Sequence, residues 1–367
     1  MPKTILVTGG AGFIGSHTAD ALARLGYSVR ILDNLQSEVH GGRWPKYVRG
    51  KGFELLRGDV RERRAWERAL KSVHAVFHLA AYQDQRLDFS TFFETNTVST
   101  ALLYETIAAR ELPVKKVVYA STQFVYGDGA WRTAQGRTFF PELRPLSALR
   151  AGRWEITGPE GEAAEPLPFD ESQAVNPTNS YGLSKYASEM MALRLGKTYG
   201  IPTAIARYSI VQGPRQSPRN LYSGALRIFV QQALAGQPIT VYEDGRQMRD
   251  FVNVRDVVAA NLLLLRSRGS DFGVFNVGGG RPVRVIDFAE KVKKITGTPA
   301  PITVGGFRRT DTRHAVSCLT RLTRLGWAPR YGISDSIRDY VEWYRAEKFD
   351  RLADVKALRA LKKGITK

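Results

Sequence analysis

The sequence contains a single cysteine, Cys318, among its 367 residues. This excludes an internal disulfide, and one thiol cannot anchor a thiolate metal cluster, so no metal site is predicted. The longest purely aliphatic run is Leu262 to Leu265, far shorter than the roughly 20 residues that a membrane span needs. A β-rich run begins already at Thr4 and leaves no room for a signal peptide. We therefore expect a cytoplasmic protein that contacts no membrane.

Acidic residues are scarce relative to basic ones. The 54 Lys and Arg residues outnumber the 35 Asp and Glu residues, which gives a formal net charge of +19. Such a balance indicates either a nucleic-acid or anionic-surface partner, or an arginine-rich composition combined with a site for a polyanionic substrate. The basic residues are scattered, with only a modest cluster in the tail at 346–367, and no known nucleic-acid-binding module is present. The second interpretation is favoured, and a nucleic-acid partner is not expected.

The length exceeds that of most compact domains, so two lobes are expected. Short β-rich runs alternate with amphipathic stretches in the first half, which is typical of βαβ units and a parallel sheet. The predicted strands are residues 4–8, 27–33, 53–58, 75–80, 116–121 and 203–208. Helices are predicted over 13–25 and 180–199, each followed by glycine.

The alternation breaks between Gly127 and Tyr181. This segment holds much of the proline of the chain, has little periodicity and contains neither Cys nor His, which excludes a zinc ribbon. A structureless stretch of this length inside a domain is usually an active-site lid or a functional insertion. We therefore predict an insertion at 130–171.

A glycine-rich turn follows the first predicted strand and opens the first predicted helix. It reads Thr-Gly-Gly-Ala-Gly-Phe-Ile-Gly from residue 8 to residue 15. Backbone N–H groups and the positive end of the helix dipole can hold a pyrophosphate there. Asp33 ends the second strand, 18 residues after Gly15, where a carboxylate binds ribose hydroxyls and repels a 2′-phosphate. The turn predicts a doubly wound parallel Rossmann sheet that binds NAD, followed by a smaller α/β substrate-binding lobe.

Tyr181 and Lys185 lie four residues apart in the second predicted helix and therefore share a helix face. A phenol with a pKa of about 10 is a poor base at neutral pH. A neighbouring ammonium and a positively charged nicotinamide ring both favour the phenolate and lower that pKa. Such a pair is common on solvated helices, but together with the glycine turn it predicts a catalytic couple.

From about residue 3 to residue 345 the chain resembles the extended short-chain dehydrogenase/reductase family, and within it the nucleotide-sugar epimerases and dehydratases. The motifs that carry this resemblance are TGGAGFIGSH from Thr8, DNLQS from Asp33, GDV from Gly58, HLAA from His78, STQFVYG from Ser121, YGLSK from Tyr181, QGPRQ from Gln212, RDFVNVRDV from Arg249, FNVGGG from Phe275 and RRTD from Arg308. The resemblance implies that Thr122, Tyr181 and Lys185 are catalytic.

The motifs and the resemblance together predict two sets of binding residues. The cofactor-binding set is Gly9, Gly12, Phe13, Ile14, Gly15, Asp33, Asn34, Asp59, Val60, Leu79, Ala80, Ala81, Asn96, Tyr181, Lys185 and Tyr208. The substrate-binding set is Gln83, Thr122, Gln123, Asn220, Tyr242, Arg249, Arg308 and Asp311. In the second set, the resemblance assigns the two arginines to the diphosphate, Asp311 to the nucleotide ribose and Tyr242 to the base.

The residues after Thr122 discriminate between reactions within the family. In the 4,6-dehydratases that the chain resembles, Ser-Thr is followed by the acid pair Asp-Glu. In this chain Thr122 is followed by Gln123 and Phe124, whose side chains cannot usefully donate or accept a proton. The hypothesis is therefore NAD-dependent epimerisation at C4 of a UDP- or dTDP-linked hexose. The alternatives are a net NAD(H)-dependent nucleotide-sugar reductase or dehydrogenase, then a 4,6-dehydratase, and outside enzymes a cofactor-bound regulator.

Two departures from the family pattern concern the substrate. Ile210 stands where the family commonly has an Asn on the substrate phosphates, and Gln212 follows it in the same motif. The insertion at 130–171 resembles that of a subgroup similar to dTDP-L-rhamnose 4-epimerases. We expect an NAD-binding domain at 1–206 with a return segment near 250–276, and a substrate-binding lobe at 207–345. A homodimer is expected through the helices near 93–110 and 180–199.

Overall fold

The computed structural model describes residues 2–84, 86–218, 224–347 and 349. The predicted substrate residue Asn220 lies outside the described residues, as does nearly all of the predicted tail at 346–367.

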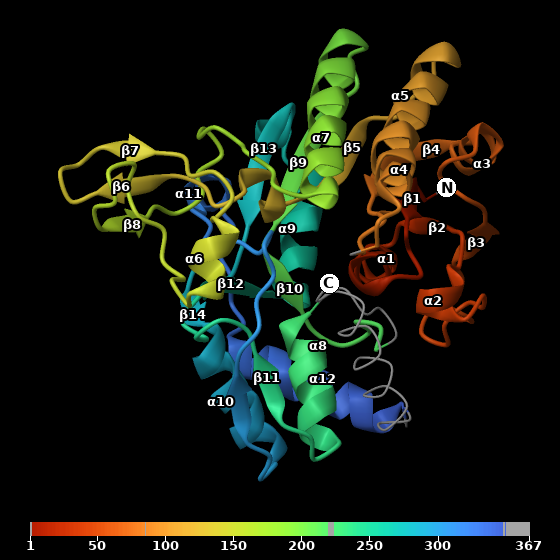
Figure 1. The fold of residues 1–367 in the computed structure, drawn as a ribbon. Helices are drawn as coiled ribbons and strands as arrows, with labels where there is room; N and C mark the ends of the chain where they lie inside the picture. Colours follow the sequence, from red (N-terminus) through yellow and green to blue (C-terminus); the bar gives the residue numbers. More distant parts are fainter. Residues whose placement is uncertain (1, 85, 219–223, 348, 350–367) are drawn as a thin grey trace.

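A parallel sheet of seven strands forms the centre of the described structure (Figure 1). In spatial order its strands are β3 (Glu54–Arg57), β2 (Ser28–Asp33), β1 (Thr4–Thr8), β4 (Val73–His78), β5 (Lys116–Thr122), β9 (Thr203–Tyr208) and β13 (Gly273–Val277). The order reverses between β1 and β4, and such a reversal leaves a crevice at the carboxyl ends of the two strands. The predicted doubly wound fold is confirmed.

Helices cover both faces of this sheet. One face packs on α1 (Phe13–Arg24), α9 (Val254–Arg266) and α11 (Thr320–Arg324), and the other on α3 (Arg63–Ala69), α5 (Ser99–Ala109) and α7 (Ser180–Thr198). Neighbouring residues of β1 show the alternation, since Ile5 belongs to the first core and Leu6 to the second. The π-helical turn at Phe93–Val98 joins α4 (Phe89–Phe92) to α5, and α2 (Ser37–His40) follows β2.

A smaller α/β lobe lies below the sheet in Figure 1. It contains the sheet β10 (Ile210–Gln212), β12 (Met248–Asn253) and β14 (Pro282–Arg284), the pair β11 (Ile239–Val241) and β15 (Ile302–Val304), and the helices α8 (Ala225–Leu234), α10 (Val285–Thr296) and α12 (Ile333–Ala346). Phe229, Phe251, Phe288 and Tyr340 are buried in its own core. Between β12 and β14 the chain returns to the large sheet as α9 and β13, in the segment expected near 250–276.

The segment predicted as a structureless insertion contains regular structure, so that part of the prediction is wrong. It forms an antiparallel sheet of β6 (Trp131–Thr133), β7 (Thr138–Phe139) and β8 (Ala164–Pro166), with α6 (Leu146–Arg150) beside it. Trp131 is completely buried. Strands of two or three residues are too short to give a periodic signal, which explains why the sequence did not reveal them.

The insertion is joined to the smaller lobe by buried charges. Arg313, whose side chain is 0% exposed, donates to Glu243 and Asp244 of the lobe at 2.8 Å each and to Glu155 of the insertion. Arg144 of the insertion donates to the other oxygen of Glu243 at 2.6 Å. Because each buried guanidinium is paired with carboxylates, this cluster holds the insertion firmly against the lobe.

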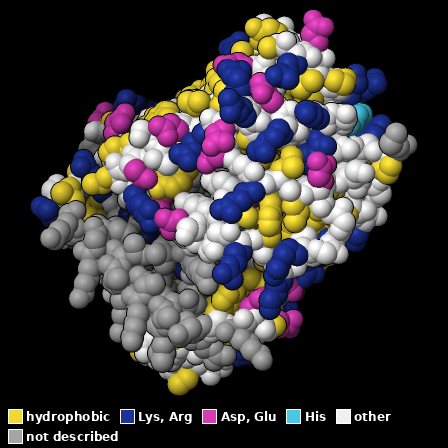
Figure 2. All heavy atoms as spheres, turned by 90° about the vertical axis from the view of Figure 1, so that its right-hand side faces the viewer, with side chains coloured by type: hydrophobic (Ala, Val, Ile, Leu, Met, Phe, Trp, Pro, Cys, Tyr) yellow, Lys and Arg dark blue, Asp and Glu magenta, His cyan; other side chains and the backbone are white. Residues whose placement is uncertain are grey.

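The surface charge follows no single patch on the face shown in Figure 2. Lys and Arg side chains are interspersed there with Asp, Glu and apolar residues. Among the described helices, none combines the length and the apolar character required to cross a membrane.

The charge cluster predicts a contribution of Glu155 to stability at acidic pH. Hydrogen bonds from His314 and Arg313 lower the pKa of Glu155 from 4.5 to about 2, against the effect of burial. A lowered folded-state pKa stabilises the protein above pH 4.5, and this stabilisation is lost as the pH falls towards 2. Because the side chain is 58% exposed, we expect a contribution of at most about 1 kcal/mol.

Melting temperatures of the wild type and of Glu155→Gln, measured across this pH range, test the prediction. The difference between the two proteins should shrink as the pH falls. Glu165→Gln, which alters an exposed carboxylate in the same insertion, is the control and should follow the wild type. A constant difference between wild type and Glu155→Gln at all pH values would contradict the prediction.

Candidate active site

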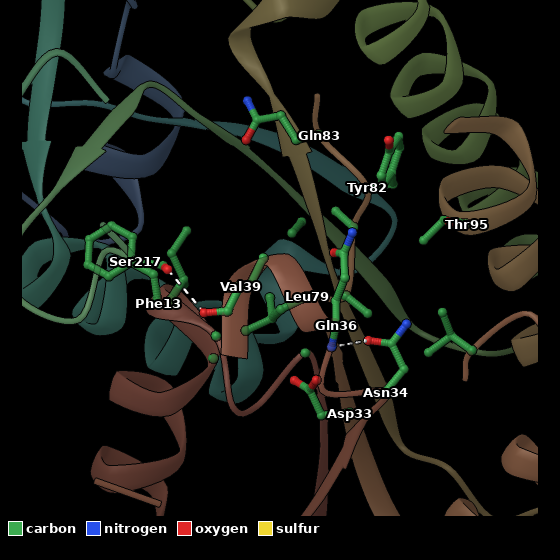
Figure 3. Close-up of a pocket in the computed structure, with 18 of the residues that line it drawn as sticks. Phe13, Asp33, Asn34, Gln36, Val39, Leu79, Tyr82, Gln83, Thr95 and Ser217 are labelled. Carbon is green, nitrogen blue, oxygen red and sulfur yellow. Dashed lines mark hydrogen bonds between the residues drawn. The ribbon is translucent and has the colours of Figure 1, made fainter. Parts of the chain in front are cut away.

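A cleft of about 430 Å³ lies at the carboxyl ends of β1 and β4, where the strand order reverses. Most of its wall comes from the large domain, and residues 215–217, after β10, close it from the other side. Figure 3 shows Ser217 opposite Val39, where the Ser217 hydroxyl donates to the Val39 carbonyl at 3.1 Å. Both parts of the molecule therefore contribute to one cleft.

The glycine turn forms the floor of this cleft. Gly9 has φ +66°, and a Cβ there would lie 2.8 Å from the backbone of Ala80. At Gly15 a Cβ would lie only 2.2 Å from the Gly9 carbonyl oxygen. No other residue type fits at these positions without moving the backbone, and the turn leads directly into the N-terminus of α1. This is the geometry of a phosphate-binding site.

Asp33 lies at the end of β2 and lines the cleft (Figure 3). Its carboxylate accepts hydrogen bonds from the backbone N–H groups of Ala11, at 3.0 Å, and Leu35, at 2.8 Å. Burial raises the pKa of this carboxyl group, and the hydrogen bonds oppose that change. The N–H of Ala11 belongs to the glycine turn, so Asp33 also holds the turn in place.

Tyr181 and Lys185 both reach the cleft from α7. Burial raises the pKa of Tyr181 to about 12, and a hydrogen bond with the Thr122 side chain opposes this. Thr122 does not itself line the described cleft, but its contact with Tyr181 brings the three predicted catalytic residues together. Phe124 packs edge-on against the Tyr181 ring, with centroids 6.2 Å apart.

Lys185 is 1% exposed, and its Nζ atom makes no hydrogen bond to any described residue. The Nζ lies 4.2 Å from the centre of the Tyr119 ring. Burial lowers the pKa of Lys185 to about 7, while the negative charge of Glu189, one helical turn away, opposes the change. A buried amine without a partner is costly, which indicates that a ligand supplies the missing acceptor.

A buried ion pair supports these residues from behind. Glu189 accepts from the Nε of Arg207 at 3.0 Å and from the hydroxyl of Ser121 at 2.8 Å. Ser121 lines the cleft. Glu189 therefore orients a cleft residue and carries the charge that acts on Lys185.

Fourteen of the predicted cofactor residues line the cleft, namely Gly9, Gly12, Phe13, Ile14, Gly15, Asp33, Asn34, Val60, Leu79, Ala80, Ala81, Tyr181, Lys185 and Tyr208. Asp59 and Asn96 are not among the lining residues. Asp59 forms an ion pair with Arg61 at 2.9 Å and accepts from Asn34 at 3.1 Å. Asn96 is 1% exposed and bonds the Tyr82 backbone and the Ser184 hydroxyl, so it orients the chain beside the cleft.

The predicted substrate residues fall into two groups. Gln83 lines the cleft, and Figure 3 shows it on the side of Tyr82. Gln123 is buried and is not among the lining residues. The second group lies in the smaller lobe, outside the lining of the described cleft. There the guanidinium of Arg308 lies 5.0 Å from the centre of the Tyr242 ring, and the Arg308 Nε makes no hydrogen bond to a described residue.

Arg249 and Asp311 belong to this second group. The guanidinium of Arg249 donates hydrogen bonds to the backbone carbonyls of Met248, Thr312 and Arg313, at 2.7 to 3.0 Å. The carbonyl of Asp311 accepts from Arg144 of the insertion at 2.8 Å. The insertion therefore contacts the segment that carries the predicted nucleotide-binding residues.

Several lining residues were missed by the sequence analysis. They include Glu38, Arg61, Thr95, Ser121, Arg215 and Ser217. Ser121 and Arg215 lie within the motifs STQFVYG and QGPRQ, which provided a signal without assigning a role. Glu38 and Thr95 lie in short helical turns, and Arg61 and Ser217 lie in loops. No local sequence pattern indicates that these four residues reach the cleft.

The residues present fit a dinucleotide. The glycine turn leaves space that any Cβ would fill, Asp33 lies at the end of β2, and Lys185 presents an unpartnered buried amine. These features match the phosphate, ribose and hydroxyl groups of such a ligand. The acidic residue at the end of β2 favours NAD over NADP.

Comparison with known proteins agrees with this geometry. The model of the NAD-dependent epimerase/dehydratase family matches residues 5–148 and 155–278. The chain is 32% identical to the dTDP-L-rhamnose 4-epimerase of Burkholderia thailandensis over 95% of this chain and 96% of that protein.

Two solved structures share the fold at similar identity. The UDP-glucose 4-epimerase of Thermotoga maritima, solved with UDP-glucose, has a TM-score of 0.77 at 28% identity and covers 94% of this chain and 99% of its own. The UDP-glucose 4-epimerase of Thermus thermophilus, solved with NAD, has a TM-score of 0.74 at 30% identity and covers 93% and 99%. With the family model matching most of its length and the cleft built as described, the chain belongs to the NAD-dependent epimerase/dehydratase family.

Proposed function

We propose that this protein catalyses NAD-dependent epimerisation at C4 of a nucleoside-diphosphate hexose. The observation that carries the proposal is that Tyr181 and Lys185 share the cleft with Thr122 next to Tyr181, while Gln123 and Phe124 follow in place of an acid pair. The named activities of the relatives in Burkholderia and Thermotoga support the same reaction class.

Tyr181 is the residue that removes a proton from the C4 hydroxyl of the sugar. Thr122 lies next to the phenol, where its hydroxyl can orient the substrate hydroxyl. Burial raises the pKa of Tyr181, against the lowering expected from the sequence. The positive charges of the Lys185 ammonium and of a bound nicotinamide ring are therefore needed to favour the phenolate. When bound, NAD supplies the hydride acceptor that becomes the hydride donor, so that oxidation to a 4-keto sugar is followed by reduction on its other face.

The neighbours of Thr122 restrict what else can happen to the sugar. Gln123 has a neutral carboxamide that is 3% exposed, and Phe124 packs its ring against Tyr181. Elimination of water needs a second acid and base close to the substrate, and these two side chains provide neither. A net reductase or dehydrogenase is the alternative that the test below separates.

The smaller lobe, residues 207–345, is the proposed site for the nucleotide, and residues 1–206 with the return segment hold the cofactor. Arg308 lies over Tyr242 with an unpartnered Nε, which suits a diphosphate next to a base. Arg249 and Asp311 are proposed for the diphosphate and the ribose. UDP and dTDP sugars are the candidate substrates.

A homodimer through α5 and α7 is part of the proposal. These helices pack against each other on one face of the sheet, and apolar side chains remain exposed near them: Phe93 at 39%, Val98 at 47% and Leu183 at 47%. Pairing with a second copy would bury these side chains. A cytoplasmic location, expected from the sequence, belongs to the same proposal.

The reaction is tested by incubating the purified protein with UDP-, dTDP-, CDP- and GDP-hexoses without added cofactor. We expect the C4 epimer of one of them, detected by NMR, with no net change in the absorbance of reduced nicotinamide. Stoichiometric formation of reduced cofactor would support a dehydrogenase instead. Absence of any conversion across the panel would contradict the proposal.

Substitution of Tyr181 tests the proton-transfer role. Tyr181→Phe keeps the ring against Phe124 but removes the hydroxyl, so activity should fall about 10²- to 10⁴-fold while bound NAD is retained. Tyr186→Phe alters a half-buried phenol on the same helix and should be close to wild type. Full activity of Tyr181→Phe would reject the proposed mechanism, although the assignment of the fold would be unaffected.

Lys185→Met should separate stability from function. The cofactor-free protein buries an amine without a hydrogen-bond partner, so the substitution should stabilise it by about 1–3 kcal/mol. Activity should be lost, because the charge that favours the phenolate is gone. Denaturant unfolding of the NAD-free proteins at pH 7 measures the first effect, and a destabilised variant would be the contrary result.

The dimer is tested by placing charge on its proposed contact. Val98→Glu combined with Leu183→Glu should give a monomer in light scattering, because like charges would face each other across the interface. Val304→Glu alters a 58% exposed residue of the smaller lobe and should leave the mass unchanged. A wild type that is already monomeric would refute this part of the proposal.

A further inference from the structure

Arg215 approaches the cofactor cleft from the smaller lobe. It follows Gly213 and Pro214 after β10, and its backbone has φ +67°, a conformation that non-glycine residues seldom adopt. It lines the same cleft as Gly12 and Phe13. A strained backbone that directs a guanidinium into a ligand cleft points to a functional constraint.

The side chain is held next to the glycine turn by two contacts. Its Nη2 donates to Asp20 of α1 at 2.8 Å, and the guanidinium lies 4.8 Å from the centre of the Tyr47 ring. The hydroxyl of Tyr47 in turn donates to the carbonyl of Ala11, within the turn, at 3.1 Å. The Nη1 of Arg215 is buried and makes no hydrogen bond to a described residue. One donor of this group therefore has no acceptor among the described residues, in a side chain that lines the cleft.

Basic side chains gather beside this part of the turn. Asp20 is shared between Arg215 and Lys51, whose Nζ lies 2.7 Å from the other carboxylate oxygen. Burial raises the pKa of Asp20, but hydrogen bonds from Lys51 and Arg215 outweigh this effect and lower it, so Asp20 is ionised. Around Asp20 two cations meet one carboxylate, and the nearby N-terminus of α1 is itself positive. The opposing negative charge beside the turn is Asp33, whose carboxylate accepts from Ala11.

We infer that Arg215 binds the pyrophosphate of NAD. Its unpartnered Nη1 donates to a phosphate oxygen, while its ion pair with Asp20 and its stacking on Tyr47 keep the guanidinium in place. The inference rests on the proposed use of NAD, and it assigns to the smaller lobe a direct part in cofactor retention. Retention matters for epimerisation, because the same cofactor must accept and return the hydride.

The matched pair Arg215→Met and Lys51→Met tests the inference. Both variants remove one cation from Asp20, but only Arg215 lines the cleft, so the pair separates loss of the ion pair from loss of the ligand contact. The readouts are the ratio of NAD to protein after purification and the dissociation constant of NAD for cofactor-stripped protein, with no sugar present.

Arg215→Met should weaken NAD binding roughly 10- to 100-fold, as expected for loss of a hydrogen bond to a charged group. Lys51→Met should bind NAD like the wild type. Arg215→Lys, which keeps the charge, should recover part of the affinity, and this distinguishes a ligand contact from a general folding defect. Equal losses in Arg215→Met and Lys51→Met, or unchanged binding in Arg215→Met, would overturn the inference.

These results are independent of the sugar reaction. NAD binding is measured without substrate, so a protein that retains NAD through Arg215 but converts no sugar would refute only the proposed function. If the wild type epimerises sugars and the Arg215→Met variant binds NAD with normal affinity, only the assignment of Arg215 is refuted.

Discussion

The cleft depends on the close approach of two backbone segments at the point where the strand order reverses. Gly9 follows β1 and Ala80 follows β4, and there is no space for a Cβ between them. The same packing limits Gly15, where α1 meets the turn. Because the turn cannot widen, the N-terminus of α1, the carboxylate of Asp33 and the backbone of Ala80 stay together, and other cleft residues are arranged around them.

The sequence was sufficient for the central sheet because its signals are local. Six of the seven strands appear where β-rich runs alternate with helices. The helices α1 and α7 end two residues before Gly26 and Gly200, both of which have positive φ. The seventh strand, β13, was covered only by a predicted return segment, because it is separated from the other strands by the smaller lobe. Periodicity identifies an element but does not tell which sheet a distant strand joins.

For the site, the motifs indicated which residues lie near the cleft, but they did not indicate which groups each side chain contacts. Tyr181 and Lys185 follow from helical spacing, since four residues place both on one face. Asn96, predicted to contact the cofactor, does not line the cleft, and its amide accepts from the Tyr82 N–H and donates to the Ser184 hydroxyl. Arg215 lines the cleft from a backbone with positive φ, and no sequence pattern predicts that conformation for an arginine. Which atom of a side chain faces a ligand is decided by tertiary packing, and a single sequence does not contain that information.

The buried arginines give a physical account of part of the basic composition. Arg207 and Arg313 form ion pairs with the buried carboxylates of Glu189 and Glu243, so they organise the interior and add nothing to a surface patch. Arg249 is different, because its guanidinium donates to backbone carbonyls and neutralises no directly bonded carboxylate. Burial alone lowers the pKa of such a group, and the nearby acids Asp311, Glu243 and Asp128 oppose that change. An anion that binds next to the buried Arg249 guanidinium would stabilise its positive charge further. A buried guanidinium that donates only to backbone carbonyls is one basic group in this chain that suits a polyanionic substrate such as a nucleoside diphosphate.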